Sequence, residues 1–218
     1  MSQYFDNKIA NIRKTFSPGP PQSSEIPSRP THELSHFRSV TDAEVRKCIM
    51  KSPSKTCAID PMPTWLVKLH LPKLLPYLTR LINMSLSTCE VPTCFKHAHI
   101  TPVLKKASLD PHDPTSYRPV SNLPFASKVL ERIVNAQVIK HMDENNLQHP
   151  FQSAYREGHS VETALLRVHS DIASAMDQQR STVLLLLDLS AAFDTVDHGI
   201  LIQRMHQVYG LGDGILQW

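Results

Sequence analysis

A run of five apolar residues, 183–187, lies between Thr182 and Asp188. A strand whose two faces are both buried has such a continuous apolar sequence, because neither face meets water. The run is too short to cross a bilayer. It therefore predicts a central sheet strand in a mixed α/β (α+β) fold, with Asp188 at the strand end.

Helices are expected around this strand, and their signals are local. Thr41 and Glu44 have the three-residue spacing of a capping box, and Ser160 is a good N-cap before a second apolar pattern. Apolar residues at helical spacing predict the long helices. The expected helices cover residues 41–49, 60–69, 73–86, 125–145, 160–175 and 198–209, with a hairpin formed by strands 97–104 and 117–121.

Charge and proline content divide the chain. Residues 1–106 carry 15 Lys and Arg against 7 Asp and Glu, a balance of +8, while residues 107–218 have a balance of −5. Residues 1–34 contain Pro- and Ser-rich stretches typical of a disordered linker, with a short helix around 4–16. We expect a helical extension over 35–96 and the sheet-containing region over 97–218.

Cysteine placement offers two interpretations. Cys89 and Cys94 lie near His97 and His99, which would suit zinc, but no second pair with zinc-finger spacing follows. Free thiols in an intracellular protein are the alternative that we favour. No signal peptide is evident, and nothing in the sequence distinguishes nucleus from cytoplasm.

Asp188 is the strongest candidate for chemistry. A carboxylate at the end of a buried strand stays ionised only if a cation or hydrogen bonds offset its burial, and carboxylate oxygen suits Mg²⁺. A capping Asp at a strand–helix junction is the structural alternative. An Asp-nucleophile phosphatase is disfavoured, because Ser190 stands where a second Asp is usual.

Several segments in order resemble the reverse transcriptases of non-LTR retrotransposons. Residues 187–194 look like motif A, in which a strand ends in the first metal-binding Asp and an aromatic residue follows five positions later. Residues 152–160 are similar to a Gln-x-Gly-Phe-Arg-x-Gly-x-Ser segment, with Ala154 and Tyr155 in place of Gly and Phe. Residues 103–106 and 117–121 resemble paired fingers strands, and residues 57–65 resemble the extension of jockey and chicken-repeat elements.

The resemblance implies a right-hand polymerase fold, with a helical N-terminal extension, fingers and the start of a palm. It also implies RNA-directed DNA synthesis from an RNA template, a DNA primer and deoxynucleoside triphosphates. Two Mg²⁺ ions would be held in part by Asp188 and the Leu189 carbonyl, and Asp194 could be structural or line the sugar pocket. The remaining implied contacts are Lys105, Lys106 and Arg118 with the triphosphate, Phe193 with the sugar as a steric gate, and Gln152, Arg156 and Ser160 with template backbone. For these last three, a local loop-and-cap network is an equal alternative.

The sequence departs from the family pattern because no Asp-Asp pair occurs in the 218 residues. Two-metal catalysis needs several carboxylates to hold both ions. We therefore expect a chain truncated after motif A that has no polymerase activity alone. The alternative function is a non-catalytic nucleic-acid-binding remnant, which the +8 front half and the expected hairpin from Lys105 to Arg118 favour. The sequence does not indicate the oligomeric state.

Overall fold

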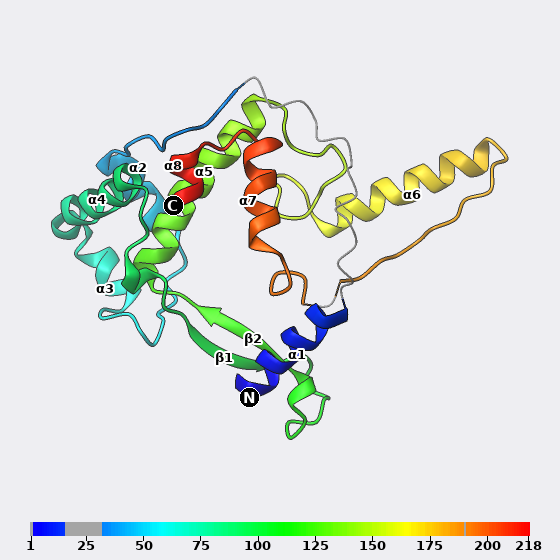
Figure 1. Ribbon diagram of the computed structural model, residues 1–218, viewed down its shortest axis with the longest axis horizontal. Coiled ribbons are helices and arrows are strands. Elements are labelled where there is room, and N and C mark those ends of the chain that lie inside the picture. The colour runs from blue at the N-terminus through cyan, green and yellow to red at the C-terminus, as the bar shows by residue number, and fades with distance from the viewer. Residues whose placement is uncertain (1, 16–31, 190) are drawn as a thin grey trace.

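The computed structural model describes residues 2–15, 32–189 and 191–218. They form a helical body from which one β-hairpin and one long helix extend (Figure 1). The elements are α1 (Ser2–Thr15), α2 (Asp42–Lys51), α3 (Thr64–Leu69), α4 (Leu71–Thr88), η1 (Thr93–Phe95), β1 (His99–Leu104), η2 (Pro114–Ser116), β2 (Tyr117–Asn122), α5 (Phe125–Glu144), α6 (Val161–Asp177), α7 (His198–Gln207) and α8 (Asp213–Gln217).

The predicted capping box starts α2. The Thr41 side chain accepts a hydrogen bond from the Glu44 backbone N–H, and the Glu44 carboxylate accepts one from the Thr41 backbone N–H. These bonds satisfy amides that the first turn of a helix leaves unpaired. The next turns bury Val45 and Ile49. The predicted helix and its cap are confirmed.

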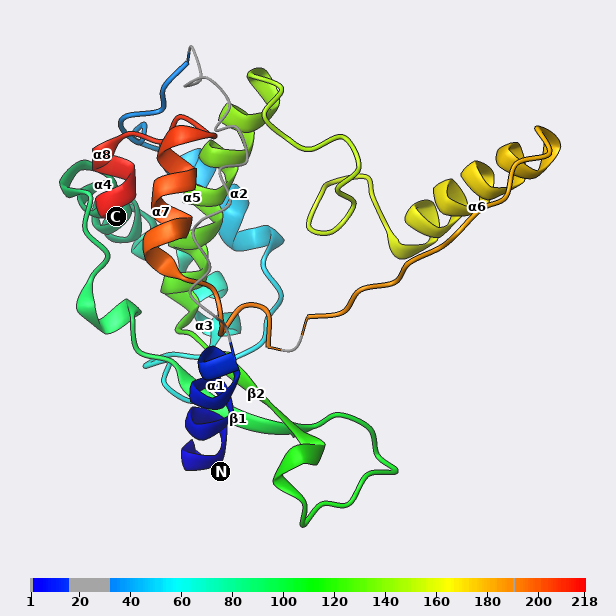
Figure 2. The same ribbon diagram turned by 45° about the vertical axis from the view of Figure 1, so that its right-hand side comes forward.

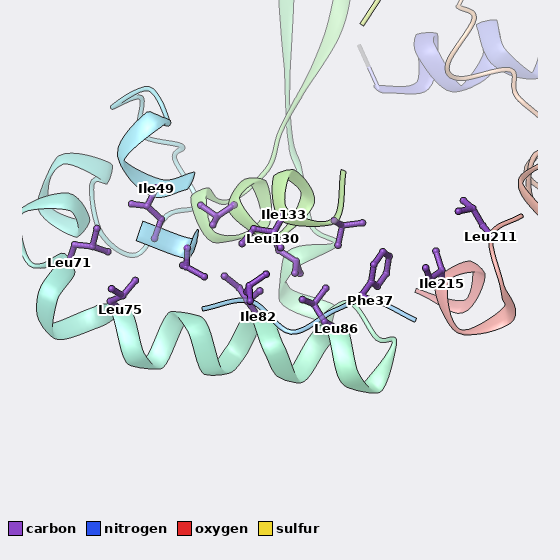
Figure 3. Packing of buried hydrophobic residues seen from close by; sticks show 14 residues of the cluster. Phe37, Ile49, Leu71, Leu75, Ile82, Leu86, Leu130, Ile133, Leu211 and Ile215 are labelled. Atoms are coloured by element: carbon purple, nitrogen blue, oxygen red, sulfur yellow. The ribbon is translucent and has the colours of Figure 1, made fainter. Parts of the chain in front are cut away.

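The core lies between α2, α4 and α5. Apolar residues recur at helical spacing on α4, so that Leu75, Ile82 and Leu86 are buried together, and Leu130 of α5 meets them (Figure 3). Helix α4 ends where Cys89 takes a left-handed backbone conformation with φ 56°. This apolar contact between helices distant in sequence fixes the body to which the hairpin is attached.

The C-terminal residues close one side of this core. Leu211 and Ile215 are buried, and the Trp218 ring meets Phe37 edge to face with ring centroids 5.8 Å apart. Backbone bonds of 2.9 Å join Leu34 to Gly210 and Gly212. The segment before α2 is thus bound to the end of the chain.

The predicted hairpin is present. Strands β1 and β2 are antiparallel, with Val103 opposite Arg118 and Leu104 opposite Tyr117. The hairpin extends away from the helical body, and α1 lies beside it in both views (Figures 1 and 2). The N-terminal helix therefore lies next to a hairpin that is about 100 residues away in the sequence.

The predicted buried strand at 182–188 is wrong for this structure. Residues 181–189 form no regular secondary structure, and Val183 is 92% exposed. A central strand needs hydrogen-bonding neighbours on both edges, but the sheet of the described residues consists of β1 and β2. Helix α6 precedes this segment and projects away from the body with no buried residue (Figure 2). Within the described residues, no helix or sheet packs over residues 181–189 or over α6.

Overall, the described architecture is mixed, largely helical with a small two-stranded sheet. The helix predicted around residues 4–16 is α1, whereas residues 16–31 of the predicted linker lie outside the described residues. The division at 34 and 96 stays a prediction.

Candidate functional site

A cavity of about 400 Å³ brings together three segments that are distant in sequence. Its volume falls in the range of small-ligand sites. Helix α1 forms one wall, the hairpin a second, and the segment after residue 187 a third. The lining residues are Phe5, Lys8, Ile9, Lys105, Tyr117, Arg118, Pro119, Asp188, Leu189, Ala191 and Asp194.

The hairpin places two cations at the cavity. Arg118 is held by pairing with β1, and Lys105 follows the last β1 residue. The Lys105 backbone N–H donates to Ser116 at 2.9 Å, and its ammonium donates to the Thr115 carbonyl at 2.7 Å. These bonds hold the start of the connecting loop, so that Lys105 and Arg118 line the same cavity.

The connecting loop carries one perturbed carboxylate. Hydrogen bonds from the Thr115 hydroxyl and backbone N–H lower the pKa of Asp113, and the nearby charge of Lys105 adds to this effect. Asp113 does not line the cavity, and these bonds order the loop that connects β1 to β2.

The third wall carries the two carboxylates. Ala191 has a left-handed backbone with φ 53°, and its carbonyl accepts hydrogen bonds from the backbone of Asp194 and Thr195. This turn places Asp194 beside the cavity that Asp188 also lines. Helix α1 is attached here, because the Arg13 guanidinium donates to the Asp194 carbonyl at 3.1 Å.

The charges at the cavity suit a phosphate-bearing ligand. The lining includes three cationic residues, Lys8, Lys105 and Arg118, and two acidic ones, Asp188 and Asp194. The planar guanidinium of an Arg can bind two phosphate oxygens at once. The carboxylates in the same lining offer hard oxygen ligands to a divalent cation.

Helix α1 was not predicted to contribute to a site. Lys8 and Arg118 lie far apart in sequence, so no motif spacing connects them. One local signal existed: Phe5 and Ile9 are spaced by four residues and form an apolar pair on a helix that needs a partner. Which partner covers them depends on the fold.

Other predicted residues lie outside this cavity. Phe193 is exposed, and its ring lies edge to face with Tyr155 at a centroid distance of 6.1 Å. Lys106 follows Lys105 but does not line the cavity. The roles predicted for Phe193 and Lys106 stay predictions.

The three residues expected at the template make local contacts. The Ser160 hydroxyl accepts from the Thr163 backbone at 3.2 Å and caps α6. The Gln152 amide donates to the Ala154 carbonyl, and the Arg156 guanidinium to the His149 carbonyl, each at 3.4 Å. These contacts are those of a loop-and-cap network, and a role at nucleic acid stays a prediction.

The described residues contain no group of three or more His, Cys, Asp or Glu side chains able to hold a metal ion. Asp188 and Asp194 alone therefore do not make a complete ion site, although each can contribute a ligand. All four cysteines are free. Cys89 is buried at the end of α4, where its thiol contacts the Leu86 carbonyl at 3.8 Å.

Comparison with known proteins decides the family. A profile described as "Reverse transcriptase (RNA-dependent DNA polymerase)" matches residues 103–211, which is half of the 218 residues. The chain belongs to the reverse transcriptase family. The matched span begins within β1 and includes all residues of the cavity except those of α1.

Relatives of this reverse transcriptase chain come from fruit-fly mobile elements. It is 29% identical over 172 residues to "RNA-directed DNA polymerase from mobile element jockey" of Drosophila melanogaster, an alignment that covers 78% of this chain and 19% of that protein. It is 32% identical over 122 residues to "Probable RNA-directed DNA polymerase from transposon X-element" of the same species, covering 56% and 13%. The predicted resemblance to jockey-type reverse transcriptases of non-LTR retrotransposons is confirmed.

The chain spans less than a fifth of the length of these relatives. The activity of the complete relatives is therefore a matter of proposal for this chain. In the described part of this chain, no helix is both long and apolar enough to cross a membrane.

Proposed function

We propose that this chain supplies part of the nucleotide and template site of a mobile-element RNA-directed DNA polymerase. Strands β1 and β2 would belong to the fingers of a right-hand polymerase, and the segment around Asp188 to the start of its palm. The observation that carries the proposal is the cavity in which Lys105, Arg118 and Asp188 lie together.

The cavity chemistry fits an incoming deoxynucleoside triphosphate. Arg118 and Lys105 would bind its phosphate oxygens, because cations on a fixed hairpin need little rearrangement to do so. Lys8 of α1 adds a third positive charge to the lining. The exposed ring of Phe193 would lie under the sugar and exclude a ribose 2′-hydroxyl.

Divalent cations would complete the site in the assembled polymerase. When bound, Mg²⁺ supplies charge neutralisation for phosphoryl transfer. Asp188 and the Leu189 carbonyl would contribute ligands, with Asp194 beside them. Gln152, Arg156 and Ser160 would contact the RNA template, with a DNA primer as the strand extended.

Nucleotide binding by the 218-residue protein tests this proposal. Titration with a fluorescent dATP analogue in Mg²⁺ should show binding that Arg118→Ala weakens about tenfold, the loss of one charge-assisted contact. Arg46→Ala, at an exposed position on α2, is the matched control. If Arg118→Ala and Arg46→Ala bind the nucleotide with equal affinity, Arg118 on the hairpin does not contact the nucleotide, and the proposed site is wrong.

The same titration distinguishes the contribution of α1 to nucleotide binding from that of the hairpin. Lys8→Ala should weaken binding about fivefold, as expected for one partly solvated charge. Lys14→Ala removes an exposed charge from the same helix outside the cavity. If Arg118→Ala weakens binding and Lys8→Ala does not, the nucleotide site stands and α1 is not part of it.

Primer extension on an RNA template tests whether the 218-residue protein has polymerase activity by itself. Asp188 and Asp194 offer fewer carboxylates than two-metal catalysis uses, and we predict no templated product with Mg²⁺ or Mn²⁺. A product that Asp188→Ala abolishes would contradict this prediction.

A second candidate function is non-catalytic binding of RNA. The +8 balance of residues 1–106 favours it, because phosphate contacts alone give sequence-independent affinity. RNA binding with a steep salt dependence and no dependence on Mg²⁺ would support this function over a nucleotide site.

A further inference from the structure

A second cavity, of about 530 Å³, lies on the surface of the helical body between α2 and α5. It is separate from the hairpin and shares no lining residue with the cavity around Asp188. We call it the α2–α5 groove. Its lining residues are Leu34, Arg38, Val40, Glu44, Lys47, Cys48, Lys51, Arg132, Ile133, Ala136, Gln137, Lys140, His141 and Glu144.

The floor of the α2–α5 groove is apolar. Val40 and Ile133 belong to the buried core, so the core supports the floor from beneath. Ala136, a small and exposed residue, also lines the groove. Cys48 is half-buried, and burial raises the pKa of its thiol, which keeps it uncharged. The floor thus offers apolar surface to a ligand without an ionised group in it.

The rims of the groove are cationic. Lys47 and Lys51 are four residues apart and form one rim on α2, whereas Arg132 and Lys140 form the other on α5. The lining contains five Lys and Arg side chains against two Glu. The groove therefore carries a surplus of three positive charges on either side of an apolar floor.

Two of these cations are already neutralised. Arg38 and Glu44 approach to 2.6 Å, and Lys140 and Glu144 to 3.6 Å. Lys47, Lys51 and Arg132 form no ion pair with another described residue, although Arg132 donates to the Ser52 hydroxyl. The surplus charge lies on these three side chains.

We infer that the α2–α5 groove binds an acidic amphipathic helix of a protein partner. Such a helix would place apolar side chains at i, i+4 and i+7 on the floor, and Glu or Asp beside them against the rims. Complementary charge would steer the partner and fix its orientation. This interaction is independent of nucleotide binding.

Single-stranded RNA fits the groove less well. Proteins that hold single strands stack bases on aromatic side chains along a cationic track, and none of the lining residues is Phe, Tyr or Trp. An RNA backbone would use the rim charges but would leave the apolar floor uncovered. RNA is therefore an outcome for the experiment to exclude.

The experiment selects binders from a displayed library of random 16-residue peptides against the 218-residue protein. Enriched peptides should be acidic, with apolar residues at helical spacing. One of them, labelled with fluorescein, then serves as the probe for direct titration. Enrichment of basic peptides, or of peptides without helical periodicity, would overturn the inference.

Variants locate the binding surface. Lys47→Glu combined with Lys51→Glu should weaken the probe at least tenfold by reversing one rim, and Ala136→Trp should do so by filling the floor. Arg46→Glu and Asn135→Trp are matched controls at exposed positions on the same helices outside the groove, and their affinities should stay within twofold of the parent. Circular dichroism identifies a variant that has unfolded, in which case the other variant decides.

Two results would overturn the inference. One is peptide affinity that both groove variants leave unchanged. The other is displacement of the probe by a 20-nucleotide oligouridine whose own binding Ala136→Trp abolishes, which would assign the groove to RNA.

Discussion

Glu44 takes part in both the start of α2 and the surface of the α2–α5 groove. Its carboxylate accepts hydrogen bonds from the Arg38 guanidinium at 2.6 Å and from the Thr41 backbone at 2.8 Å. The Arg38 bond, followed by the Thr41 bond, lowers the pKa of Glu44 to about 2, against an ordinary value of 4.5. Two neighbours on one carboxylate thus connect the segment before α2 to the helix itself.

These bonds predict a pH dependence of stability. Because the pKa of Glu44 is depressed in the folded state, its contribution is complete above pH 4.5 and is lost as the pH falls toward 2. Glu44→Gln should lower the free energy of unfolding by about 0.5 kcal/mol at pH 7, as the exposed ion pair is worth little. Urea unfolding of both proteins should show this difference shrink between pH 4.5 and 2.

A matched control is Glu144→Gln. It makes the same substitution in the Lys140 ion pair of 3.6 Å on the exposed side of α5, where no capping box is involved. A pH-independent difference between the parent and Glu44→Gln would contradict the role assigned to the Glu44 charge.

The helices differ in what they bury. Helix α5 contributes Leu130, which is 1% exposed, whereas α6 is the more amphipathic of the two but buries no residue. An isolated helix of this length is marginal in water, because packing supplies most helical stability. Helix α5 should therefore be stable and α6 should open readily.

Two substitutions compare these helices. Leu130→Ala should cost about 2–5 kcal/mol of unfolding free energy, the range for removing a buried Leu. Leu165→Ala, at a position 63% exposed on α6, should stay within about 0.5 kcal/mol of the parent. Chemical denaturation measures both. A comparable loss in Leu165→Ala would mean that α6 is packed in solution.

The sequence predicted the bounds of the helices better than it predicted which elements pack together. Caps and apolar spacing are short-range signals, so the helices that begin at Thr41 and Ser160 were predicted near their observed bounds. Strand pairing depends on residues far away, and the apolar run 183–187 therefore predicted burial that no described layer supplies. Asp188 does reach Lys105 and Arg118 at one cavity, but Lys8 joins it through a tertiary contact that no spacing encodes.

At the scale of the whole molecule, the part that projects from the helical body exposes a continuous apolar run. Residues 183–187 and the apolar side chains of α6 are exposed on the part that projects from the body (Figure 2). An extended apolar segment with unpaired backbone groups is a template for pairing with another chain. The helical body, by contrast, has a closed core.

Self-association should therefore proceed through residues 183–187. Leu186→Lys places a charge at a position that is 83% exposed, so it should lower the aggregated fraction without changing the thermal midpoint of the helical body. Light scattering across a concentration series measures the first quantity, and circular dichroism the second. Tyr77→Lys is the control, because Tyr77 is also exposed but lies on α4, away from this segment. If Leu186→Lys aggregates as the parent does, residues 183–187 are not the contact surface, and their burial within one chain would have to be reconsidered. If Tyr77→Lys alone remains dispersed, the contact surface lies on the helical body.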